Sequence, residues 1–353
     1  MAVLDNFYDF LRIYKDSSIN ILYNELVNGD NNIGVCEKNY EICKRAIDIL
    51  DIKVDDFKEQ YLLSSFLWEY ANAKAIANEN SPNVILTGAP GTGKTFLAKQ
   101  IAKQMIGVES DEELEKSGQY AFVQFHPSYD YTDFVEGLRP TKPDANGNIG
   151  FELKDGIFKE FCKKAIEAKQ DINSEKVFVF VIDEINRGEI SKIFGELFFS
   201  IDPSYRGEKG AVKTQYSNMH NDKDEKFYVP ENVYIIGTMN DIDRSVESFD
   251  FAIRRRFTWK EITAEQSAEN MNLDEETKRK MTELNEGISQ IKGLNNSYHI
   301  GGAYFLDSDG NPIQDYKYIW EHRIEPLLKE YLRGLPDPKK DLITLKEAYE
   351  KEG

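Results

Sequence analysis

Residues 88–95 combine glycine, lysine and threonine at a spacing that can bind a phosphate group. They read Gly-Ala-Pro-Gly-Thr-Gly-Lys-Thr, which fits the phosphate-binding pattern G-x-x-x-x-G-K-[ST]. Glycines let the backbone curl so that its N–H groups converge on an anion. The apolar run 84–86 predicts a buried strand before the loop, and 96–106 predicts an amphipathic helix after it, with its N-terminus toward the anion. A glycine turn with a chance lysine is the alternative, and the matching flanks disfavour it.

The loop predicts a site for a magnesium ion and a nucleoside triphosphate. Lys94 can reach the β- and γ-phosphates, and the Thr95 hydroxyl can coordinate Mg²⁺. The residues expected to bind the nucleotide are Gly88, Ala89, Pro90, Gly91, Thr92, Gly93, Lys94, Thr95 and Phe96.

Two carboxylates follow a second apolar run. Residues 177–182, Val-Phe-Val-Phe-Val-Ile, predict a central strand buried on both faces, with Asp183 and Glu184 at its carboxyl end. Ligands of open α/β sheets bind at that end of the strands. We expect Asp183 to hold the magnesium ion through water and Glu184 to polarise the attacking water. An acidic helix N-terminus stabilised by the helix dipole is the alternative.

An asparagine and three arginines complete the set of candidate residues. Asn240 follows a strand predicted at 233–236, where its amide can hydrogen-bond both the water and the γ-phosphate. Arg254, Arg255 and Arg256 stand where a helix would end. Cations stabilise a helix C-terminus, which is one interpretation. The other is an arginine finger presented to the γ-phosphate of a neighbouring subunit, with another arginine of the run pairing with the acids of 247–250.

The remaining pattern predicts strands and helices that position these residues in an α/β fold. Further strands are expected at 120–125 and 258–263, and further helices at 158–169, 191–199, 275–287 (extended to 294 after a break) and 316–333, kinked at Pro326. Irregular segments are expected at 110–117 (a surface excursion), 140–150 (a loop), 204–226 (a hairpin insertion or mobile loop), 300–306 (a turn entering a short strand) and beyond Pro336 and Pro338 (a fraying tail). Residues 1–80 predict helices, either as a bundle covering part of the core or as a docking module.

Composition excludes several classes of protein. The 353 residues carry a formal net charge of −18, which disfavours a general DNA-binding surface because phosphates repel it. Three cysteines cannot form a disulfide framework, and they suggest a reducing compartment, the cytoplasm. No secretory signal and no membrane-spanning run is recognisable. Four scattered histidines and the absence of a Cys-x-x-Cys pair make a zinc site improbable.

The order of these motifs resembles AAA+ NTPases, and several segments resemble the McrB family in particular. The resembling segments are 183–187 (Asp-Glu-Ile-Asn-Arg), 237–245 (Gly-Thr-Met-Asn-Asp-Ile-Asp-Arg-Ser), 125–140, Tyr304-Phe305 and 324–331 (Ile-Glu-Pro-Leu-Leu-Lys-Glu-Tyr). The resemblance covers roughly residues 80–335.

The resemblance implies an AAA+ P-loop core, a parallel sheet flanked by helices, at 81–262, between a helical N-terminal region (1–80) and a helical lid (263–353). It implies an NTPase using GTP or ATP with Mg²⁺, whose site comprises Lys94, Thr95, Asp183, Glu184 and Asn240. Arg187 and the three arginines would line the interface of a homo-oligomeric, typically hexameric ring. The implied partner is an McrC-like nuclease in DNA restriction or phage defence, with DNA contacted indirectly or through another module. The alternatives are a MoxR-like ATPase that remodels proteins and a scaffold that binds nucleotide but hardly hydrolyses it.

Overall fold

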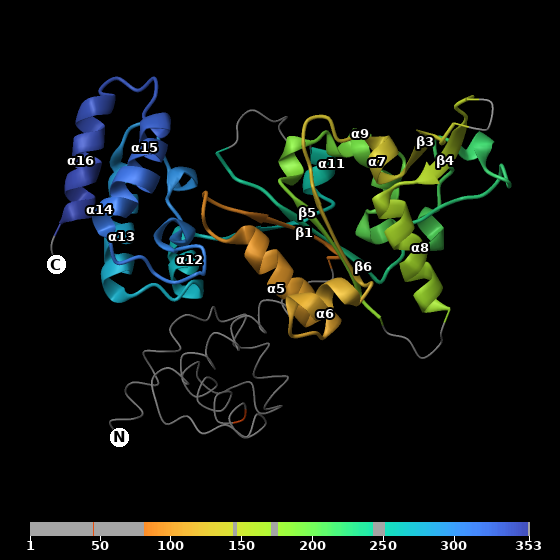
Figure 1. The fold of residues 1–353 in the computed structure, drawn as a ribbon, viewed down its shortest axis with the longest axis horizontal. Coiled ribbons are helices and arrows are strands. Elements are labelled where there is room, and N and C mark those ends of the chain that lie inside the picture. The colour runs from red at the N-terminus through yellow and green to blue at the C-terminus, as the bar shows by residue number, and fades with distance from the viewer. Residues whose placement is uncertain (1–44, 46–80, 144–146, 171–175, 243–250, 352–353) are drawn as a thin grey trace. The chain divides into compact units, whose positions relative to one another are not determined.

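The computed structural model describes Arg45 and residues 81–143, 147–170, 176–242 and 251–351. The chain divides into two compact units, one of residues 82–99 and 112–353 and the other of 1–81 with 100–111. The helices expected in 1–80 therefore lie outside the described residues, apart from Arg45. Apart from the residues of helices α5 (Lys94–Ile106) and α6 (Asp111–Lys116) that fall in 100–111, the following description concerns the first unit, many of whose elements are labelled in Figure 1.

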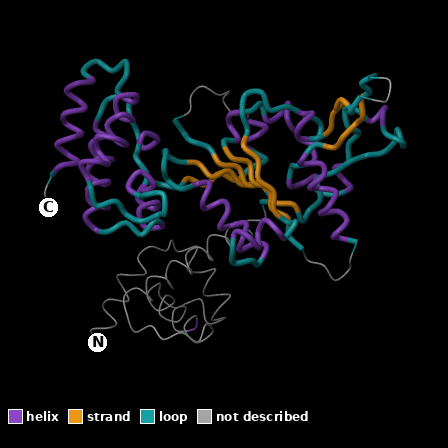
Figure 2. The backbone as a smooth tube through the Cα atoms, in the orientation of Figure 1, coloured by secondary structure: helices purple, strands orange, loops and turns teal. Residues whose placement is uncertain are grey.

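A five-stranded parallel sheet forms the centre of the α/β region (Figure 2). The strands lie in the order β2 (Tyr120–Gln124), β5 (Phe178–Asp183), β6 (Val233–Thr238), β1 (Asn83–Thr87) and β7 (Thr258–Glu261). Every residue of β1 is buried, whereas β2 lies at the edge with one buried residue. All five predicted strands are confirmed, and the three inner strands, β5, β6 and β1, carry the continuous apolar runs that are typical of strands covered on both faces.

Helices and one hairpin surround this sheet. The helices are α5 (Lys94–Ile106), α6 (Asp111–Lys116), α7 (Tyr131–Phe134), α8 (Ile157–Lys169), α9 (Ile190–Phe194), α10 (Leu197–Ser200) and α11 (Phe251–Arg254), and short 3₁₀ turns lie at Ile185–Arg187, Pro203–Tyr205, Glu208–Gly210 and Ser217–Met219. Strands β3 (Glu136–Pro140) and β4 (Phe151–Asp155) pair antiparallel as a separate hairpin, which the sequence did not predict because only its first two residues are buried and no apolar run marks it.

Two expected segments differ in detail. Residues 110–117 contain the helix α6 rather than only a surface excursion, because Leu114 is fully buried and holds it down. The helix expected at 191–199 is two short helices, because Gly195 adopts a left-handed φ of 52° that interrupts the helical backbone.

Buried aromatic side chains hold the sheet to its helices. Phe134 stacks on Phe158 with ring centroids 4.7 Å apart, and both contact Phe180 of β5 edge-to-face at 5.7 and 5.0 Å. Phe194 of α9 packs against Phe134 at 4.7 Å. Because Phe180 precedes Asp183 by three residues, this cluster fixes the strand that carries the predicted carboxylates.

Residues 204–226 are not a hairpin. A single antiparallel bridge joins Val212 to Phe227, and the segment otherwise consists of turns. Fully buried Glu136 anchors it by accepting hydrogen bonds from the Tyr216 amide at 3.2 Å and pairing with His220 at 2.9 Å. Lys159 forms a buried ion pair with the same carboxylate and also contacts Asp155 at 2.9 Å, so the buried Glu136 charge has a cationic partner.

A second buried core organises the C-terminal helices, which gather into one bundle in Figure 1. They are α12 (Ala264–Asn270), α13 (Glu275–Gln290), α14 (Tyr316–Ile319), a π-helical turn (Trp320–Ile324), α15 (Glu325–Tyr331) and α16 (Pro338–Glu350), with 3₁₀ turns at Asn296–Tyr298 and Gly302–Phe305. Thr263 and Gln266 form a capping box at the start of α12, and Asp274 caps α13. The interruption predicted near Pro326 is confirmed as the π-helical turn.

Two expectations for this region are wrong, and a third is wrong in part. Helix α13 continues unbroken to Gln290, so no break stands at 287. The turn expected at 300–306 is present as a 3₁₀ turn at Gly302–Phe305, but the strand after it is limited to a single antiparallel bridge between Leu306 and Pro312. The tail beyond Pro338 is helix α16, whose Leu345 and Tyr349 are buried. Proline fits the first turn of a helix, so Pro338 starts α16.

The buried face of α16 yields a stability prediction. Leu345→Ala removes a fully buried side chain that packs beside Gly287 of α13, and we expect it to lower the free energy of unfolding by about 2–5 kcal/mol. Ile343→Ala, at a site 60% exposed on the same helix, is the matched control and should change it by less than about 0.5 kcal/mol. Urea denaturation followed by circular dichroism measures both, and equal effects would contradict the packing of α16.

Candidate nucleotide-binding site

The loop between β1 and α5 has the backbone of an anion cradle. Gly88, Gly91 and Gly93 adopt φ angles of 145°, 76° and 77°, which side-chain-bearing residues rarely adopt. A Cβ on Gly88 would lie 2.3 Å from the Ile262 carbonyl oxygen, so close approach of backbone also requires glycine there. The α5 helix starts at Lys94 and directs its N-terminus at the loop.

Lys94 places its ammonium group inside this cradle. Its Nζ donates hydrogen bonds to the carbonyls of Gly88 at 3.0 Å and Ala89 at 2.8 Å, and to the Thr92 hydroxyl at 3.2 Å. The side chain is buried, so its charge is weakly screened by water. Phosphate oxygens in the cradle would meet a positive charge that is already held at the centre of the loop.

Two hydroxyls converge on one carboxylate oxygen at the end of β5. Asp183 Oδ1 accepts hydrogen bonds from Thr95 Oγ1 at 2.7 Å and from Thr238 Oγ1 at 2.6 Å. These hard oxygen donors suit Mg²⁺, which is bound through one or two carboxylates plus waters and phosphate. Among the described residues, no group of three or more His, Cys, Asp or Glu side chains could hold a metal ion.

Glu184 is held in an uncommon backbone conformation. Its φ of 51° and ψ of 44° lie in the left-handed region, where a residue with a side chain costs on the order of 1 kcal/mol. Its carboxylate accepts hydrogen bonds from Asn240 Nδ2 at 3.0 Å and from Arg187 Nε at 3.3 Å. The predicted base, the predicted amide and Arg187 therefore lie together.

The cavity between these strand ends has a volume of about 210 Å³. It is lined by Gly91, Gly93, Lys94, Thr95, Phe96, Glu184, Thr238, Met239, Asn240 and Ala303. Residues from three separate predicted motifs thus share one cavity. Next to the loop, burial raises the pKa of Asp241, an effect that the nearby positive charge of Lys94 opposes.

Sequence reasoning missed two contributors to the site. Thr238 lies two positions before Asn240, and this alternation in an extended chain is a signal that could have identified it. The other contributor is the segment 301–304, which follows α13 in the chain. The Gly301 and Ala303 amides donate to the carbonyls of Pro90 and Gly91, both at 3.0 Å. Tyr304 lies against Gly91, where a Cβ would approach its ring to 2.6 Å.

The three arginines lie away from this cavity. Arg254 and Arg255 are exposed, and the Arg254 guanidinium lies 5.3 Å from the Trp259 ring centroid. Arg256 is buried, with its guanidinium 4.3 Å from the Phe198 ring centroid. Arg255 has Asp202 as a carboxylate neighbour at 3.4 Å, and the expected pairing with residues 247–250 lies outside the described residues.

The contact of residue 301 with the loop can be tested by sterics alone. Gly301 has an ordinary φ of −83°, yet an added Cβ would lie 2.3 Å from the Gly91 carbonyl carbon. We expect Gly301→Ala to cost about 1–3 kcal/mol at this contact, and hence to weaken nucleotide binding roughly tenfold or more. Calorimetric titration with ATP and GTP measures it. Gly150→Ala, whose Cβ meets a hydroxyl at 3.1 Å, is the control, and equal affinities would refute the contact.

Among the described helices, none combines the length and the hydrophobicity that a membrane span needs.

Comparison with protein families gives two matches. The family model for the AAA domain (dynein-related subfamily) matches residues 83–257, and the family model for the McrB alpha-helical lid domain matches residues 276–340.

Curated relatives agree with these matches. The chain is 40% identical over 265 residues to the type IV methyl-directed restriction enzyme EcoKMcrB subunit of Escherichia coli K12, covering 70% of this chain and 53% of that protein. It is 27% identical over 212 residues to the type II restriction enzyme BsuMI component YdiS of Bacillus subtilis 168, covering 52% and 57%. A match to the Holliday junction branch migration complex subunit RuvB of Chlorobium phaeobacteroides, 40% identical over 76 residues, covers 21% and 22%. The chain thus spans about half the length of these two restriction-system relatives. With a parallel α/β core followed by an McrB-type helical lid, it belongs to the McrB family of AAA+ proteins.

Proposed function

We propose that this chain is the motor subunit of a DNA restriction system, which hydrolyses GTP or ATP with Mg²⁺ in a homo-oligomeric, typically hexameric ring. The observation that carries the proposal is the convergence of Lys94, Thr95, Asp183, Glu184 and Asn240 at one edge of the sheet. The E. coli relative is a restriction-enzyme subunit and the B. subtilis relative is a restriction-enzyme component, which supports a role for this chain in a restriction system.

Each side chain of the site has a separate role in the proposed hydrolysis. Lys94 holds the β- and γ-phosphates through the charge it keeps inside the loop. Thr95 and Asp183 would hold the magnesium ion, which would supply positive charge to neutralise the phosphates. Glu184 accepts a proton from the attacking water, and Asn240, bonded to its carboxylate at 3.0 Å, orients that water and the γ-phosphate.

An arginine supplied by a neighbouring subunit completes the proposed site. The segment 254–256 is tied to Asn83, at the amino end of β1, whereas the phosphate loop follows the carboxyl end. Five strand residues separate these ends by roughly 16 Å, which is farther than an arginine side chain reaches. Arg254 and Arg255 are exposed and are therefore the better candidates, whereas buried Arg256 has a structural role. Arg187, beside Glu184, would lie near the same interface.

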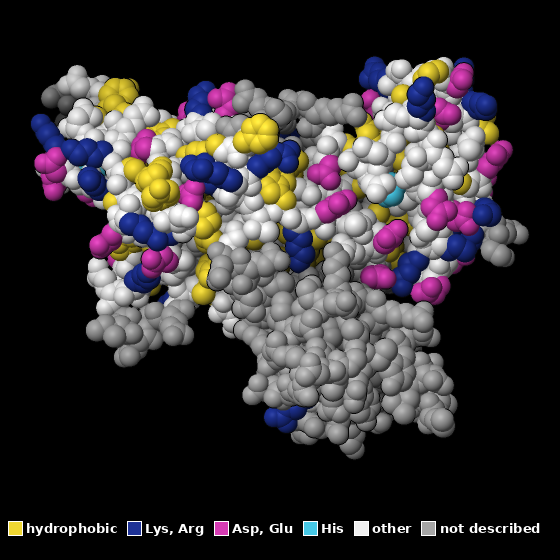
Figure 3. Space-filling view, turned by 180° about the vertical axis from the view of Figure 1, so that it is seen from behind, with side chains coloured by type: hydrophobic (Ala, Val, Ile, Leu, Met, Phe, Trp, Pro, Cys, Tyr) yellow, Lys and Arg dark blue, Asp and Glu magenta, His cyan; other side chains and the backbone are white. Residues whose placement is uncertain are grey.

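An McrC-like nuclease is the proposed partner, and DNA is contacted indirectly or through another module. The net charge of −18 opposes direct binding of DNA by this chain. On the face shown in Figure 3, acidic and basic side chains are interspersed over the described surface rather than gathered into a basic groove. A role in phage defence and a place in the cytoplasm follow from the proposal.

The decisive test is turnover of ATP and of GTP by the purified chain, with and without the protein encoded by the neighbouring gene. We expect Mg²⁺-dependent turnover that this partner stimulates. Absence of turnover of both nucleotides under both conditions would refute the proposed activity, whereas turnover that is insensitive to the partner would instead favour a protein-remodelling ATPase.

The base assignment yields a further prediction. Glu184→Gln keeps the size of the side chain but removes its basicity, so we expect nucleotide affinity to be retained and turnover to fall by about 10²-fold or more. Steady-state hydrolysis and equilibrium binding measure the two effects. Glu189→Gln, at an exposed carboxylate paired with Lys192, is the control and should hydrolyse normally. Wild-type turnover by Glu184→Gln would show that another group is the base.

A mixing experiment tests the arginine in trans. A chain with both Arg254→Ala and Arg255→Ala should lose turnover by ~10³-fold. Adding a Lys94→Ala chain, which keeps its arginines, should restore it, because each partner supplies what the other lacks. Arg333→Ala, at a side chain 80% exposed on the lid, should need no rescue. Failure of rescue, together with specific activity that stays flat on dilution, would contradict a trans-acting arginine.

A further inference from the structure

The side chain of buried Asn83 hydrogen-bonds to the backbone of residues 254–256, the arginine segment. Asn83, the first residue of β1, has no exposed surface. Its Nδ2 donates to the Arg256 carbonyl and to the Ile201 carbonyl, both at 2.7 Å. Its Oδ1 accepts a hydrogen bond from Arg206. One side chain therefore joins β1 to two segments that are more than a hundred residues away in sequence.

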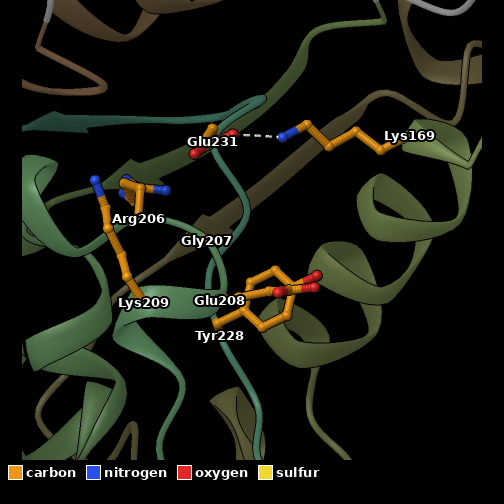
Figure 4. Close-up of a pocket in the computed structure, with 7 residues that line it drawn as sticks. All are labelled: Lys169, Arg206, Gly207, Glu208, Lys209, Tyr228 and Glu231. Carbon is orange, nitrogen blue, oxygen red and sulfur yellow. Dashed lines mark hydrogen bonds and ion pairs between the residues drawn. The ribbon is translucent and has the colours of Figure 1, made fainter. Parts of the chain in front are cut away.

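Arg206 holds Asn83 in this orientation. Its guanidinium is buried and donates to the carbonyls of Ile201 at 3.1 Å, Val233 at 3.1 Å and Pro230 at 3.4 Å. It lies in the wall of a cavity of about 410 Å³, in which Lys169 and Glu231 pair with each other at 2.5 Å (Figure 4). Burial lowers the pKa of Arg206 to about 10, so it is protonated at neutral pH.

Asp202 contacts the side chains of two arginines in the same segment, Arg255 and Arg256. Its Oδ2 lies 3.4 Å from Arg255 Nη2 and 3.8 Å from Arg256 Nε, and its Oδ1 accepts from the Ser204 amide at 3.1 Å. Arg256 stays buried over Phe198 and donates to the Ala252 carbonyl at 2.8 Å. The exposed side chains of Arg254 and Arg255 thus project from a backbone that is held on its inner side.

We propose that Asn83, supported by Arg206 and Asp202, is a positioning residue for the arginine that acts on a neighbouring subunit's nucleotide. This inference rests on the proposed trans-acting arginine. The cluster acts on the subunit that gives the arginine, and it leaves that subunit's own phosphate loop, at the other end of β1, unchanged.

A positioning role is expected because an arginine that is not held in place stabilises the transition state less well. Charge stabilisation of a transition state requires a guanidinium whose place is set in advance, and a misplacement of about 1 Å can cost on the order of 10²-fold in rate. An exposed arginine carries several free rotatable bonds, so the backbone beneath it sets where it can reach. Asn83 contacts that backbone directly at the Arg256 carbonyl.

The test exploits the difference between giving and receiving the arginine. The acceptor chain carries Arg254→Ala and Arg255→Ala with an intact phosphate loop, and the donor carries Lys94→Ala. We expect Asn83→Ala added to the donor to lower the rescued kcat at least about tenfold with an unchanged KM for nucleotide. The same change added to the acceptor should leave rescue within about twofold. Asn232→Ala in the donor is the matched control, because Asn232 precedes β6 and donates to the carbonyls of Ala165 and Lys176.

Further measurements separate positioning from loss of fold. Thermal melting and size-exclusion chromatography of each donor establish folding and assembly. Asp202→Asn keeps the shape of the side chain and removes its charge, and we expect this donor to lose rescue by roughly two- to fivefold.

Undiminished rescue by the Asn83→Ala donor, or equal loss on the donor and acceptor sides, overturns the positioning role. If the Asn83→Ala donor does not fold, undiminished rescue by the Asp202→Asn donor overturns it as well. Failure of the Lys94→Ala donor itself to rescue shows instead that the proposed function lacks a trans-acting arginine, and the positioning role falls with it.

Discussion

Parallel pairing of β1, β5 and β6 is the constraint on which the candidate site depends. In the observed register, Ile182 of β5 lies opposite Gly237 of β6, and Leu86 of β1 lies opposite Thr238. The three strands therefore end side by side, and the residues that follow them enter one cavity. If neighbouring strands were antiparallel, β6 would run against β5 and β1, and Thr238 and Asn240 would lie at the edge opposite Asp183 and the phosphate loop. The hydrogen bonds that Asp183 accepts from Thr95 and Thr238 depend on this shared edge.

Because the strands are parallel, their amino ends also share one edge of the sheet, opposite the phosphate loop. Asn83 and Val233 begin β1 and β6 at the end opposite the phosphate loop, and buried Arg206 joins them there. If an arginine acts in trans, each subunit offers a nucleotide at one edge and a guanidinium at the other. A head-to-tail ring satisfies this arrangement because it brings unlike surfaces of identical chains together.

Residues 301–304 connect the hydrophobic core of the C-terminal helices to the phosphate loop. The amides of Gly301 and Ala303 bind carbonyls of the phosphate loop, and Tyr304 covers Gly91. Backbone hydrogen bonds need no particular side chain, which explains why spacing along the sequence does not reveal them. They link nucleotide binding at the loop directly to the position of residues 301–304.

Local patterns in the sequence determined the phosphate loop, the buried strands and the carboxylates at the end of β5, because glycine conformation and apolar periodicity act over a few residues. The same patterns misjudged Pro338, since proline both ends helices and starts them, and only Leu345 and Tyr349 packing in the lid core decides between the two. Tertiary structure alone decided the partners of Asn83. This residue meets Arg206 across 123 positions and Arg256 across 173, and such contacts arise from the strand order rather than from any local spacing.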